Sequence, residues 1–528
     1  MSDSSQATVR KSATLRVLDA IERAGNKLPD ATTLFFIFIG LLIVVSVIGA
    51  ALGWSAVNPG TGKTMEVTSL LSNENVRKLL EEMPRTLTAF APLGTVLVMM
   101  LGTGIAEKSG YFSAALRGAL KGASKTLLTP LVVFLGCMSS IAVDAGYVVL
   151  VPLGAAIFAA AGRHPIAGLA AAFAGVSGGF SANLFPSSLD ALLLGITQEA
   201  ARIVDPTWTY TITDNYYLII AFTVLVTLLG WFVTDRIVEP RLGTWSGHAD
   251  AAASEVKRAE LTAQERSGVF WGTVWLVVPI VAVCLMALPG GALRDPEAGT
   301  EVMQQLGPFF TALVAALAGA FFLAGLAYGI CTGRYKSDKD AVADVNSSMS
   351  EMGAYIVLAF AAAHFIAMFN WSGLGAVMAI NGAEGIKALG LPAPLLFVLL
   401  IIMTASINLL VGSASAKWGM LAPILVPMFM LMGYSPEVVT GAYRLGDSAT
   451  NIITPLMAYF PMALVFAQRY VKDFGIGSMV ATMLPFSIAF LIGSLVLISV
   501  WVGVGFPMGP DAPIHYQLPG TGAAPATP

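Results

Sequence analysis

The sequence predicts an all-α polytopic membrane protein, from its composition, its long apolar segments and an internal repeat. Of its 528 residues, 56% are hydrophobic and 12% are charged, against about 45–50% and 25% in ordinary soluble domains. Uncharged apolar segments of about 20 residues, the length of a membrane-spanning helix, recur along the chain. A soluble globular fold is therefore excluded. We expect nine transmembrane helices plus two re-entrant hairpins in an inverted-topology repeat.

The chain opens with a polar leader, residues 1–31, which lacks the early apolar core of a cleaved signal peptide and is expected to be cytoplasmic. Residues 32–85 then supply the first span and an external loop. Uncharged spans are expected at Thr32–Gly53, Thr86–Ala106, Tyr216–Val233, Val269–Leu288, Phe309–Ile330 and Ser478–Gly503. A seventh span, Met352–Phe369, contains His364, which we interpret as a satisfied buried histidine.

Residues 86–198 and 349–472 are two copies of one unit, a span followed by a broken hairpin and a long broken helix. Identities at a constant offset of 271 residues are Pro152/Pro423, Gly162/Gly433, Pro165/Pro436, Gly175/Gly446 and Ser177/Ser448. Hairpin arms are expected at Leu127–Gly136, Tyr147–Ala161, Pro394–Leu409 and Trp418–Met432, and broken helices at Ile166–Gly195 and Glu437–Phe466. Residues 199–348 are predicted scaffold spans and loops, and 473–528 the last span with an external tail.

The sidedness of the spans follows from Lys and Arg in the short loops. The leader holds five such residues and the segment after residue 106 holds four, whereas the loops 199–214 and 289–308 hold one each. One loop, residues 54–85, holds four basic residues although it is placed outside. The balance predicts a cytoplasmic N-terminus and a periplasmic C-terminus, so the first hairpin enters from the cytoplasm and the second from outside.

Five charged residues lie deep within apolar segments, and all belong to the two broken regions: Asp144, Asp190, Lys417, Arg444 and Asp447. A charge at the bilayer centre costs at least about 2.5–3.5 kcal/mol, so such groups pair, titrate or face a water-filled cavity. Inverted repeats with discontinuous helices are typical of secondary transporters, whose sites lie at the unwound backbone.

Each candidate site residue has two interpretations. Arg444, just before an expected break at 445–451, either binds a substrate carboxylate through its fork or forms a structural pair with Asp447 at i+3. Trp418 either offers a flat face to an aromatic ligand or packs. Asp190 is either a proton carrier or a permanent counter-charge to Arg444.

Oxygen-bearing side chains gather at the hairpin tip and the breaks, and oxygen ligands suit a hard cation. The alternative is that they satisfy the backbone groups freed by the breaks. These candidates are Ser415 at the second tip, Asn408 and Asp447 beside it, and Asn183 and Asn451 in the two breaks.

Other function classes find little support. A net charge of −3 gives no basic face for nucleic acid. Cys137, Cys284 and Cys331 lack the spacing of a zinc site or a disulfide framework. A Gly-x-Ser-Gly sequence at 175–178 matches intramembrane serine proteases, but His364 is the sole imidazole within a span and a helix break already explains the motif. We therefore expect no enzyme, and two unlike inverted halves argue against a channel.

Three motifs resemble the AbgT family, the p-aminobenzoyl-glutamate transporters, within the wider ion-transporter superfamily. They are Ser415-Ala-Lys-Trp418, Ser435-Pro436 and Tyr443-Arg-Leu-Gly-Asp-Ser-Ala-Thr-Asn-Ile-Ile-Thr-Pro455. The resemblance implies nine spans, two hairpins and a homodimer. It also implies transport roles for Asp190, Trp418, Pro436 and Arg444, and a bound sodium ion at Asn408 and Asp447.

From the resemblance we expect an exporter of p-aminobenzoate-like compounds and sulfonamide antimetabolites in the bacterial inner membrane, coupled to a proton gradient through Asp190. The alternatives are an importer of p-aminobenzoyl-glutamate and a sodium-coupled carboxylate symporter. The expected partners are a small aromatic carboxylate or sulfonamide, membrane lipid and a second copy of the chain. No cofactor beyond sodium is expected.

Overall fold

The structure is a computed structural model, and it describes residues 29, 31–57, 62–120, 124, 126–141, 146–245, 260–298, 302–454, 457 and 459–517. The chain is mostly helical, as the sequence predicts. Nearly all of the predicted leader, the first hairpin tip with Asp144, Pro455 of the third motif and the end of the tail lie outside the described residues.

Eight helices of the described part are long and apolar enough to cross a membrane, which makes the chain a multi-pass membrane protein. Seven of them overlap the seven predicted uncharged spans, whereas the eighth, Ala414–Leu431, was expected to be a hairpin arm. The eight segments are Thr32–Ala51, Asn73–Lys108, Tyr216–Leu242, Ala263–Met286, Gly307–Cys331, Asp338–Trp371, Ala414–Leu431 and Ile476–Val504.

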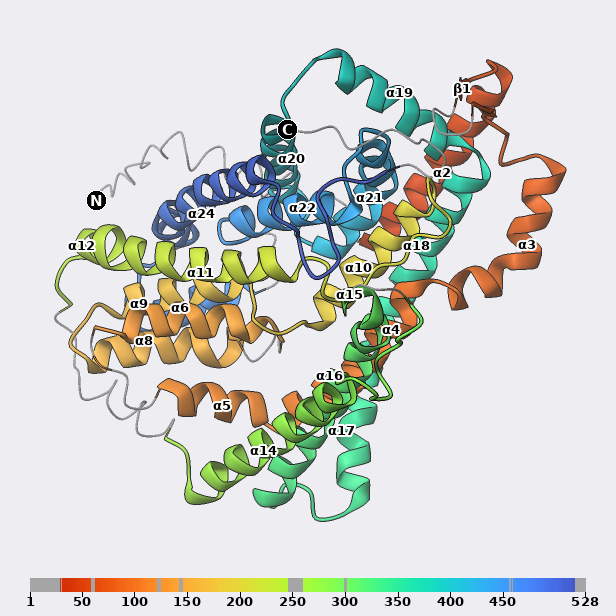
Figure 1. The fold of residues 1–528 in the computed structure, drawn as a ribbon. Coiled ribbons are helices and arrows are strands. Elements are labelled where there is room, and N and C mark those ends of the chain that lie inside the picture. The colour runs from red at the N-terminus through yellow and green to blue at the C-terminus, as the bar shows by residue number, and fades with distance from the viewer. Residues whose placement is uncertain are drawn as a thin grey trace, which may run out of the picture.

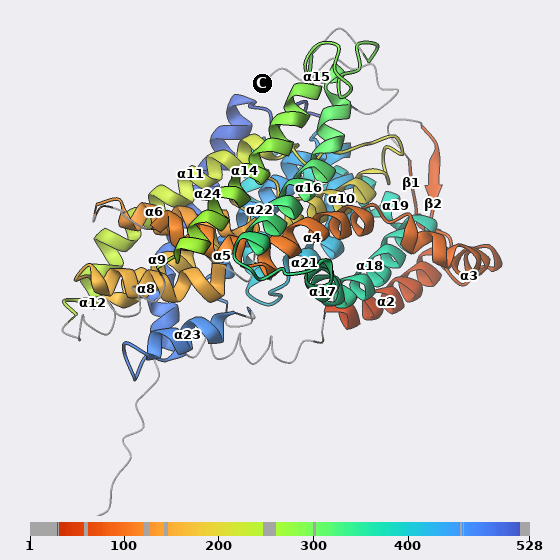
Figure 2. The ribbon, with the colours of Figure 1, turned by 90° about the horizontal axis from the view of Figure 1, so that it is seen from below.

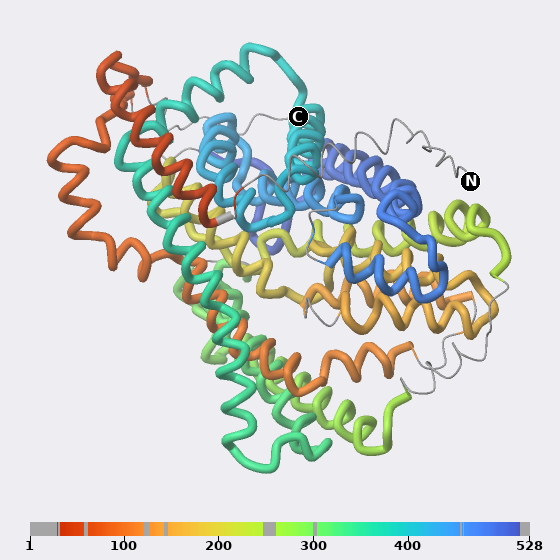
Figure 3. The backbone as a smooth tube through the Cα atoms, turned by 180° about the vertical axis from the view of Figure 1, so that it is seen from behind, coloured from red at the N-terminus to blue at the C-terminus, as the bar shows by residue number. Residues whose placement is uncertain are grey.

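Two groups of helices form the body of the protein (Figure 1). The first group runs diagonally along one side and consists of α2 (Ala31–Ala51), α4 (Ala91–Lys108), α14 (Ala263–Met286), α16 (Gly307–Cys331), α17 (Asp338–Glu351) and α18 (Gly353–Trp371). The second consists of α6 (Leu128–Met138), α8 (Val151–Ala160), α9 (Pro165–Phe173), α11 (Tyr216–Val233), α20 (Ala393–Asn408), α22 (Pro436–Asn451) and α24 (Ile476–Val504). Figure 3 shows from behind that α20, α22 and α24, drawn in cyan to blue, pack against one another.

Two helices connect these groups. α10 (Ser188–Ala201) packs against α4 of the first group and against α21 (Ala414–Leu431), and α21 also packs against α22. Figure 2 shows α10 beside α4 from below. Because α10 and α21 follow the first break and the second hairpin tip, the predicted site elements lie where the two groups meet.

Shorter elements complete the described part of the chain. They are α3 (Asn73–Thr88), α5 (Tyr111–Leu120), α12 (Glu239–Leu242), α15 (Val302–Gln305), α19 (Leu374–Ala388) and α23 (Phe460–Gln468), with the 3₁₀ turn η1 (Ser139–Ile141) and the π-helical segments η2 (Gly146–Leu150), η3 (Ala174–Gly178) and η4 (Thr234–Val238).

The predicted external loop 54–85 has regular structure that hydropathy missed. Strands β1 (Ser55–Val57) and β2 (Thr64–Glu66) pair antiparallel, with Ser55 opposite Glu66. Helix α3 follows, and the Ser72 side chain caps it by accepting a hydrogen bond from the Asn75 backbone N–H. α3 is too polar to register as a span, and its folding depends on this cap and on contacts with α18 and α4.

The repeat identities mark the same backbone turn in both copies. Gly162 (φ +79°) ends the second hairpin arm of copy one and Gly433 (φ +90°) that of copy two. Only glycine adopts this left-handed conformation without strain. Three residues later Pro165 and Pro436 begin α9 and α22, where a missing N–H costs nothing.

The breaks are only partly where the sequence places them. The first lies between Gly178 and Ser188, as expected within 166–195. The second was expected at 445–451, but α22 remains helical to Asn451 and α23 begins at Phe460, so that expectation was wrong. Helix α20 explains the extension, because the Asn408 amide donates to the Asp447 carbonyl at 2.7 Å and so supports the last turns of α22.

Candidate functional site

A central cavity of about 580 Å³ lies between the second hairpin tip and the two breaks. Among its walls are Ser415 of the tip and Asn451 at the end of α22, two of the predicted site residues. Aromatic side chains line much of the rest: Tyr147, Phe180, Tyr355 and Tyr459. Tyr147 and Tyr459 stack with their ring centroids 4.2 Å apart. The cavity therefore combines ring faces with hydroxyl and amide groups, as a site for a small polar aromatic molecule requires.

Asp190 and Arg444 form an ion pair behind this cavity. The Arg444 Nη2 lies 2.6 Å from the Asp190 Oδ1, and the two side chains are 5% and 4% exposed. Asp190 is held in the first turn of α10, where its Oδ2 accepts hydrogen bonds from the Ser187 backbone N–H at 2.6 Å and the Ser187 hydroxyl at 2.7 Å. Arg444 also donates to the Ser181 carbonyl in the first break. The pair thus joins α22 to the first break and α10.

This pairing separates the alternatives for Arg444 and Asp190. The i+3 pair between Arg444 and Asp447 is not formed, because each takes another partner. Asp190 is the counter-charge of Arg444 in this conformation. The Arg444 Nε is buried without a hydrogen-bond partner in the described part of the chain. The guanidinium therefore keeps one buried donor that no described residue uses.

Lys417, Asp447 and Asn408 form a second buried polar cluster. The Lys417 Nζ donates to both the Asp447 Oδ1 and the Asn408 Oδ1, and the Lys417 and Asp447 side chains are 1% and 2% exposed. The Asn408 amide donates to the Thr450 hydroxyl at 3.0 Å and to the Asn451 Oδ1 at 2.9 Å. The cluster ties α21, α20 and α22 together at the end of the second hairpin.

The predicted sodium site coincides with this cluster, and its residues do not fit a sodium ion as they stand. The Asn408 and Asp447 oxygens that would coordinate the ion already accept hydrogen bonds from the Lys417 ammonium. A cation between them would be in contact with another cation, which Coulomb repulsion opposes. The chain therefore supplies its own positive charge at this position.

Trp418 lies beside the cavity rather than in its wall. Its side chain is fully buried, its Nε1 donates to the Thr197 hydroxyl of α10 at 2.9 Å, and its ring stacks on Tyr443 with centroids 4.5 Å apart. Thr197 in turn hydrogen-bonds Thr440 of α22 at 2.9 Å. In this conformation Trp418 packs, and it connects α21 to α10 and α22.

The remaining predicted residues are distributed over the surrounding elements. Pro436 begins α22, at the opposite end from the cavity, and its carbonyl accepts a hydrogen bond from Thr440 at 2.8 Å. Asn183 lies in the first break, and its amide is 3.4 Å from the Ser140 hydroxyl of the first hairpin. Asn451 was expected in the second break but is the last residue of α22. The structure thus brings Ser415 and Asn451 to the cavity wall and holds the other predicted residues outside it.

Sequence reasoning missed the residues that hold the site together. Thr197 and Thr440 are ordinary threonines in helices, and nothing in their sequence context marks them, whereas Thr450 lies within the motif 443–455. Tyr147 had a usable signal, because it lies at the repeat offset from Trp418. Subtracting the 271-residue offset from Trp418 at the second hairpin tip leads to Tyr147 at the first hairpin tip.

The structure gives no support to a serine protease arrangement. The Ser177 hydroxyl donates to the Met457 sulphur at 3.1 Å, and the His364 Nδ1 is bonded to the Phe360 carbonyl of its own helix at 2.7 Å. A nucleophile and its base must be within hydrogen-bond reach. Ser177 and His364 share no hydrogen bond in the described structure.

Comparison with known proteins finds relatives over nearly the whole chain. A model of the AbgT putative transporter family matches residues 16–516. The p-aminobenzoyl-glutamate transport protein of Escherichia coli (strain K12) is 38% identical over 491 residues, covering 93% of this chain and 95% of that protein. The YdaH transporter of Alcanivorax borkumensis is 43% identical, with a TM-score of 0.85 over 91% of this chain and 100% of that one. MtrF of Neisseria gonorrhoeae, described as illuminating a class of antimetabolite efflux pumps, is 43% identical, with a TM-score of 0.88 over 94% and 100%.

Proposed function

The chain belongs to the AbgT putative transporter family, and on this premise we propose that it exports p-aminobenzoate-like and sulfonamide antimetabolites across the bacterial inner membrane, driven by a proton gradient. Family membership makes it a membrane transporter. The description of MtrF as an antimetabolite efflux pump supports the direction and the substrate class. The aromatic and hydroxyl-bearing walls of the central cavity support a ring with polar ends.

The ion pair between Asp190 and Arg444 is the observation that carries proton coupling. A proton that binds Asp190 removes the carboxylate charge and ends the pair, and loss of the proton restores it. The pair therefore has two electrostatic states, which a proton gradient biases in opposite directions on the two sides of the membrane. With the pair intact, the Nε–H of Arg444 has no partner among the described residues, so it can donate a hydrogen bond to the anionic end of a substrate in a conformation that opens the cavity to it. Proton and substrate then bind in alternation, as export against inward proton movement requires.

The membrane architecture follows the same proposal. Nine transmembrane helices and two re-entrant hairpins, with the N-terminus in the cytoplasm and the C-terminus in the periplasm, account for the element order of the two copies. In this arrangement α20 and α21 form the second hairpin although α21 has the length of a span. The family also suggests a homodimer in a lipid bilayer. Pro436 and Asn183 are proposed to matter as the ends and breaks of the moving helices.

An importer of p-aminobenzoyl-glutamate is the second candidate, because the Escherichia coli relative carries that name. The Asp190–Arg444 pair allows this direction if the substrate carboxylate replaces Asp190 on Arg444, since the released Asp190 then needs a proton that travels with the substrate. A sodium-coupled carboxylate symporter is less well supported, because Lys417 holds the oxygens of the predicted sodium site.

Reconstituted vesicles with imposed pH gradients separate these functions. We expect labelled p-aminobenzoate to leave the cytoplasmic side faster when the opposite side is acidic, and Asp190→Asn to abolish this dependence. Asp338→Asn is the matched control, since Asp338 is an exposed acidic residue in the first turn of α17. Flux that ignores the pH gradient overturns proton coupling. Accumulation of p-aminobenzoyl-glutamate on the cytoplasmic side favours the importer.

A further inference from the structure

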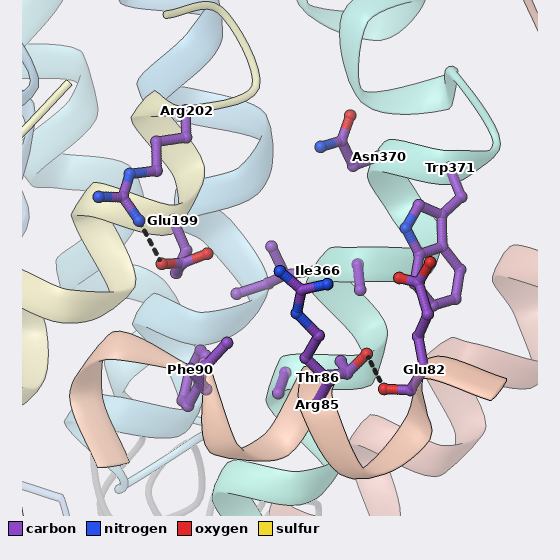
Figure 4. A pocket seen from close by; sticks show the side chains of 12 residues that line it. Glu82, Arg85, Thr86, Phe90, Glu199, Arg202, Ile366, Asn370 and Trp371 are labelled. Carbon is purple, nitrogen blue, oxygen red and sulfur yellow. Dashed lines mark hydrogen bonds and ion pairs between the residues drawn. The ribbon is translucent and has the colours of Figure 1, made fainter. Parts of the chain in front are cut away.

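A second cavity lies at the elbow where α3 meets α4, and we call it the elbow cavity. It has a volume of about 240 Å³ and is lined by side chains from the end of α3, the end of α10 and the second half of α18. In Figure 4 Arg85 reaches towards α18 near Ile366, while Glu199 of α10 and Arg202, which caps α10, pair with each other on one side of the cavity and Trp371 faces Glu82. No site residue predicted from the sequence lies in this cavity.

The elbow cavity and the central cavity share three helical elements. The central cavity touches α4 at Val96, α10 at Leu192 and α18 at Tyr355. The elbow cavity touches Phe90, which caps α4, and reaches α10 at Glu199 and α18 at Ala363. At 1.5 Å per residue these positions are separated by about 9–12 Å along each helix. The two cavities therefore lie in line along α4, α10 and α18.

A close helix contact separates the two cavities. Gly195 of α10 approaches α4 so closely that a Cβ on it would lie 2.5 Å from the Pro92 ring. Gly195 and Pro92 both lie between the levels of the two cavities. This close packing of α10 on α4 lies between the two cavities, at the position where a gate on a path joining them would have to open.

The lining of the elbow cavity suits a specific kind of ligand. Arg202 is neutralised by Glu199, with its Nη1 3.2 Å from the Glu199 Oε1. Arg85 forms no ion pair or side-chain hydrogen bond with any described residue, so its guanidinium is available to an anion. Trp371 adds a ring face, and the carboxylates of Glu82 and Glu199 can accept N–H bonds.

We propose that the elbow cavity is a second binding site on the transport path, for an aryl amine that carries a carboxylate or sulfonamide at the far end of its ring. Arg85 binds the anionic end, Trp371 packs on the ring, and Glu82 or Glu199 accepts the amine. The proposal rests on the proposed function, since it takes the same substrate class to a second position. The loops that border the cavity are those predicted to be periplasmic.

Cysteine protection tests this site without measuring transport. In a variant lacking the three native cysteines, Asn370→Cys places a thiol at the cavity, where a membrane-impermeant maleimide added from outside can react. We expect p-aminobenzoate to slow this labelling. Adding Arg85→Gln should raise the half-protecting concentration about tenfold or more, because a charge-assisted hydrogen bond is lost. Arg77→Gln, an exposed change on the same helix away from the cavity, should leave it unchanged.

The possible outcomes are distinct. Labelling that p-aminobenzoate does not slow, in a protein that transports the compound, overturns the elbow site and leaves the proposed function standing. Protection that Arg85→Gln and Arg77→Gln weaken equally also overturns it. Protection that depends on Arg85 in a protein that does not transport p-aminobenzoate supports the site and contradicts the proposed function. Arg85 is exposed, so Arg85→Gln is expected to fold.

Discussion

Replacing Lys417 by Met tests whether the chain supplies its own cation beside Asp447. Met keeps most of the side-chain length but removes the ammonium, so the Asp447 carboxylate, 2% exposed, is left without its partner. Removing one member of a buried ion pair costs about 3–5 kcal/mol of folding free energy. For a chain of this length that corresponds to a fall of about 3–4 °C in the unfolding midpoint. Lys339→Met, at an exposed position on α17, should leave the midpoint unchanged.

A double variant separates the charge from the packing. Lys417→Met with Asp447→Val removes both charges, and replacing a whole buried pair by apolar residues is often neutral or stabilising. Val is the residue that copy one has at the equivalent position, Val176. We therefore expect the double variant to melt above the single variant and near the wild type.

The assay is thermal unfolding in detergent, followed by tryptophan fluorescence, in sodium, potassium and N-methylglucamine chloride at one ionic strength. With Lys417 absent, the Asn408 and Asp447 oxygens are free to coordinate sodium. At a hundred times its dissociation constant an ion bound only to the folded state adds about 2.7 kcal/mol. Sodium should therefore raise the midpoint of Lys417→Met and not that of the wild type. Equal stabilisation of both proteins by sodium would refute the reasoning.

Three further predictions concern other parts of the fold. Gly195→Ala should destabilise the protein by about 1–3 kcal/mol through overpacking. Gly94→Ala, with open space around it, should be neutral or stabilising, and thermal unfolding midpoints will show the difference. Burial raises the pKa of Asp214, in the loop before α11, to about 7. Because the folded state then binds the proton more tightly than the unfolded state, the free energy of unfolding should fall by about 4 kcal/mol at most as the pH rises from 4 to 7. Asp214→Asn should flatten that midpoint profile. Trp418→Phe keeps an aromatic ring but loses the 2.9 Å bond to Thr197 and part of a fully buried side chain. It should therefore cost more than the about 1 kcal/mol of the hydrogen bond alone and slow p-aminobenzoate flux in vesicles, and unchanged flux would contradict a role for this link.

The features predictable from the sequence were those that local rules determine. Spans were visible because each must bury about 20 apolar residues in lipid, and seven were located correctly. The turns at Gly162 and Gly433 were visible as repeat identities because a positive φ restricts the residue type. The family was recognisable from three short motifs within residues 415–455, and the family model matches residues 16–516.

Pairing across the chain could not be predicted in the same way. Arg444 has an acidic neighbour one helical turn away, Asp447, and the local rule therefore favoured that pair. Its actual partner, Asp190, is 254 residues away, and the choice depends on how α10 and α22 pack. The extension of α22 through 445–451 likewise depends on Asn408, which lies on another helix.

The repeat shows which part of the second polar cluster the fold itself requires. The positions of Asn408, Lys417 and Asp447 correspond, at the 271-residue offset, to Cys137, Gly146 and Val176. The geometry is retained, since a Cβ on Gly146 would lie 2.9 Å from the Val176 side chain, just as Lys417 contacts Asp447. Copy one thus makes the same junction from apolar and small residues, so the junction needs no ions to form. Because a buried ion pair is weak evidence for stability, the charges in copy two are better explained by a transport role that the two copies do not share.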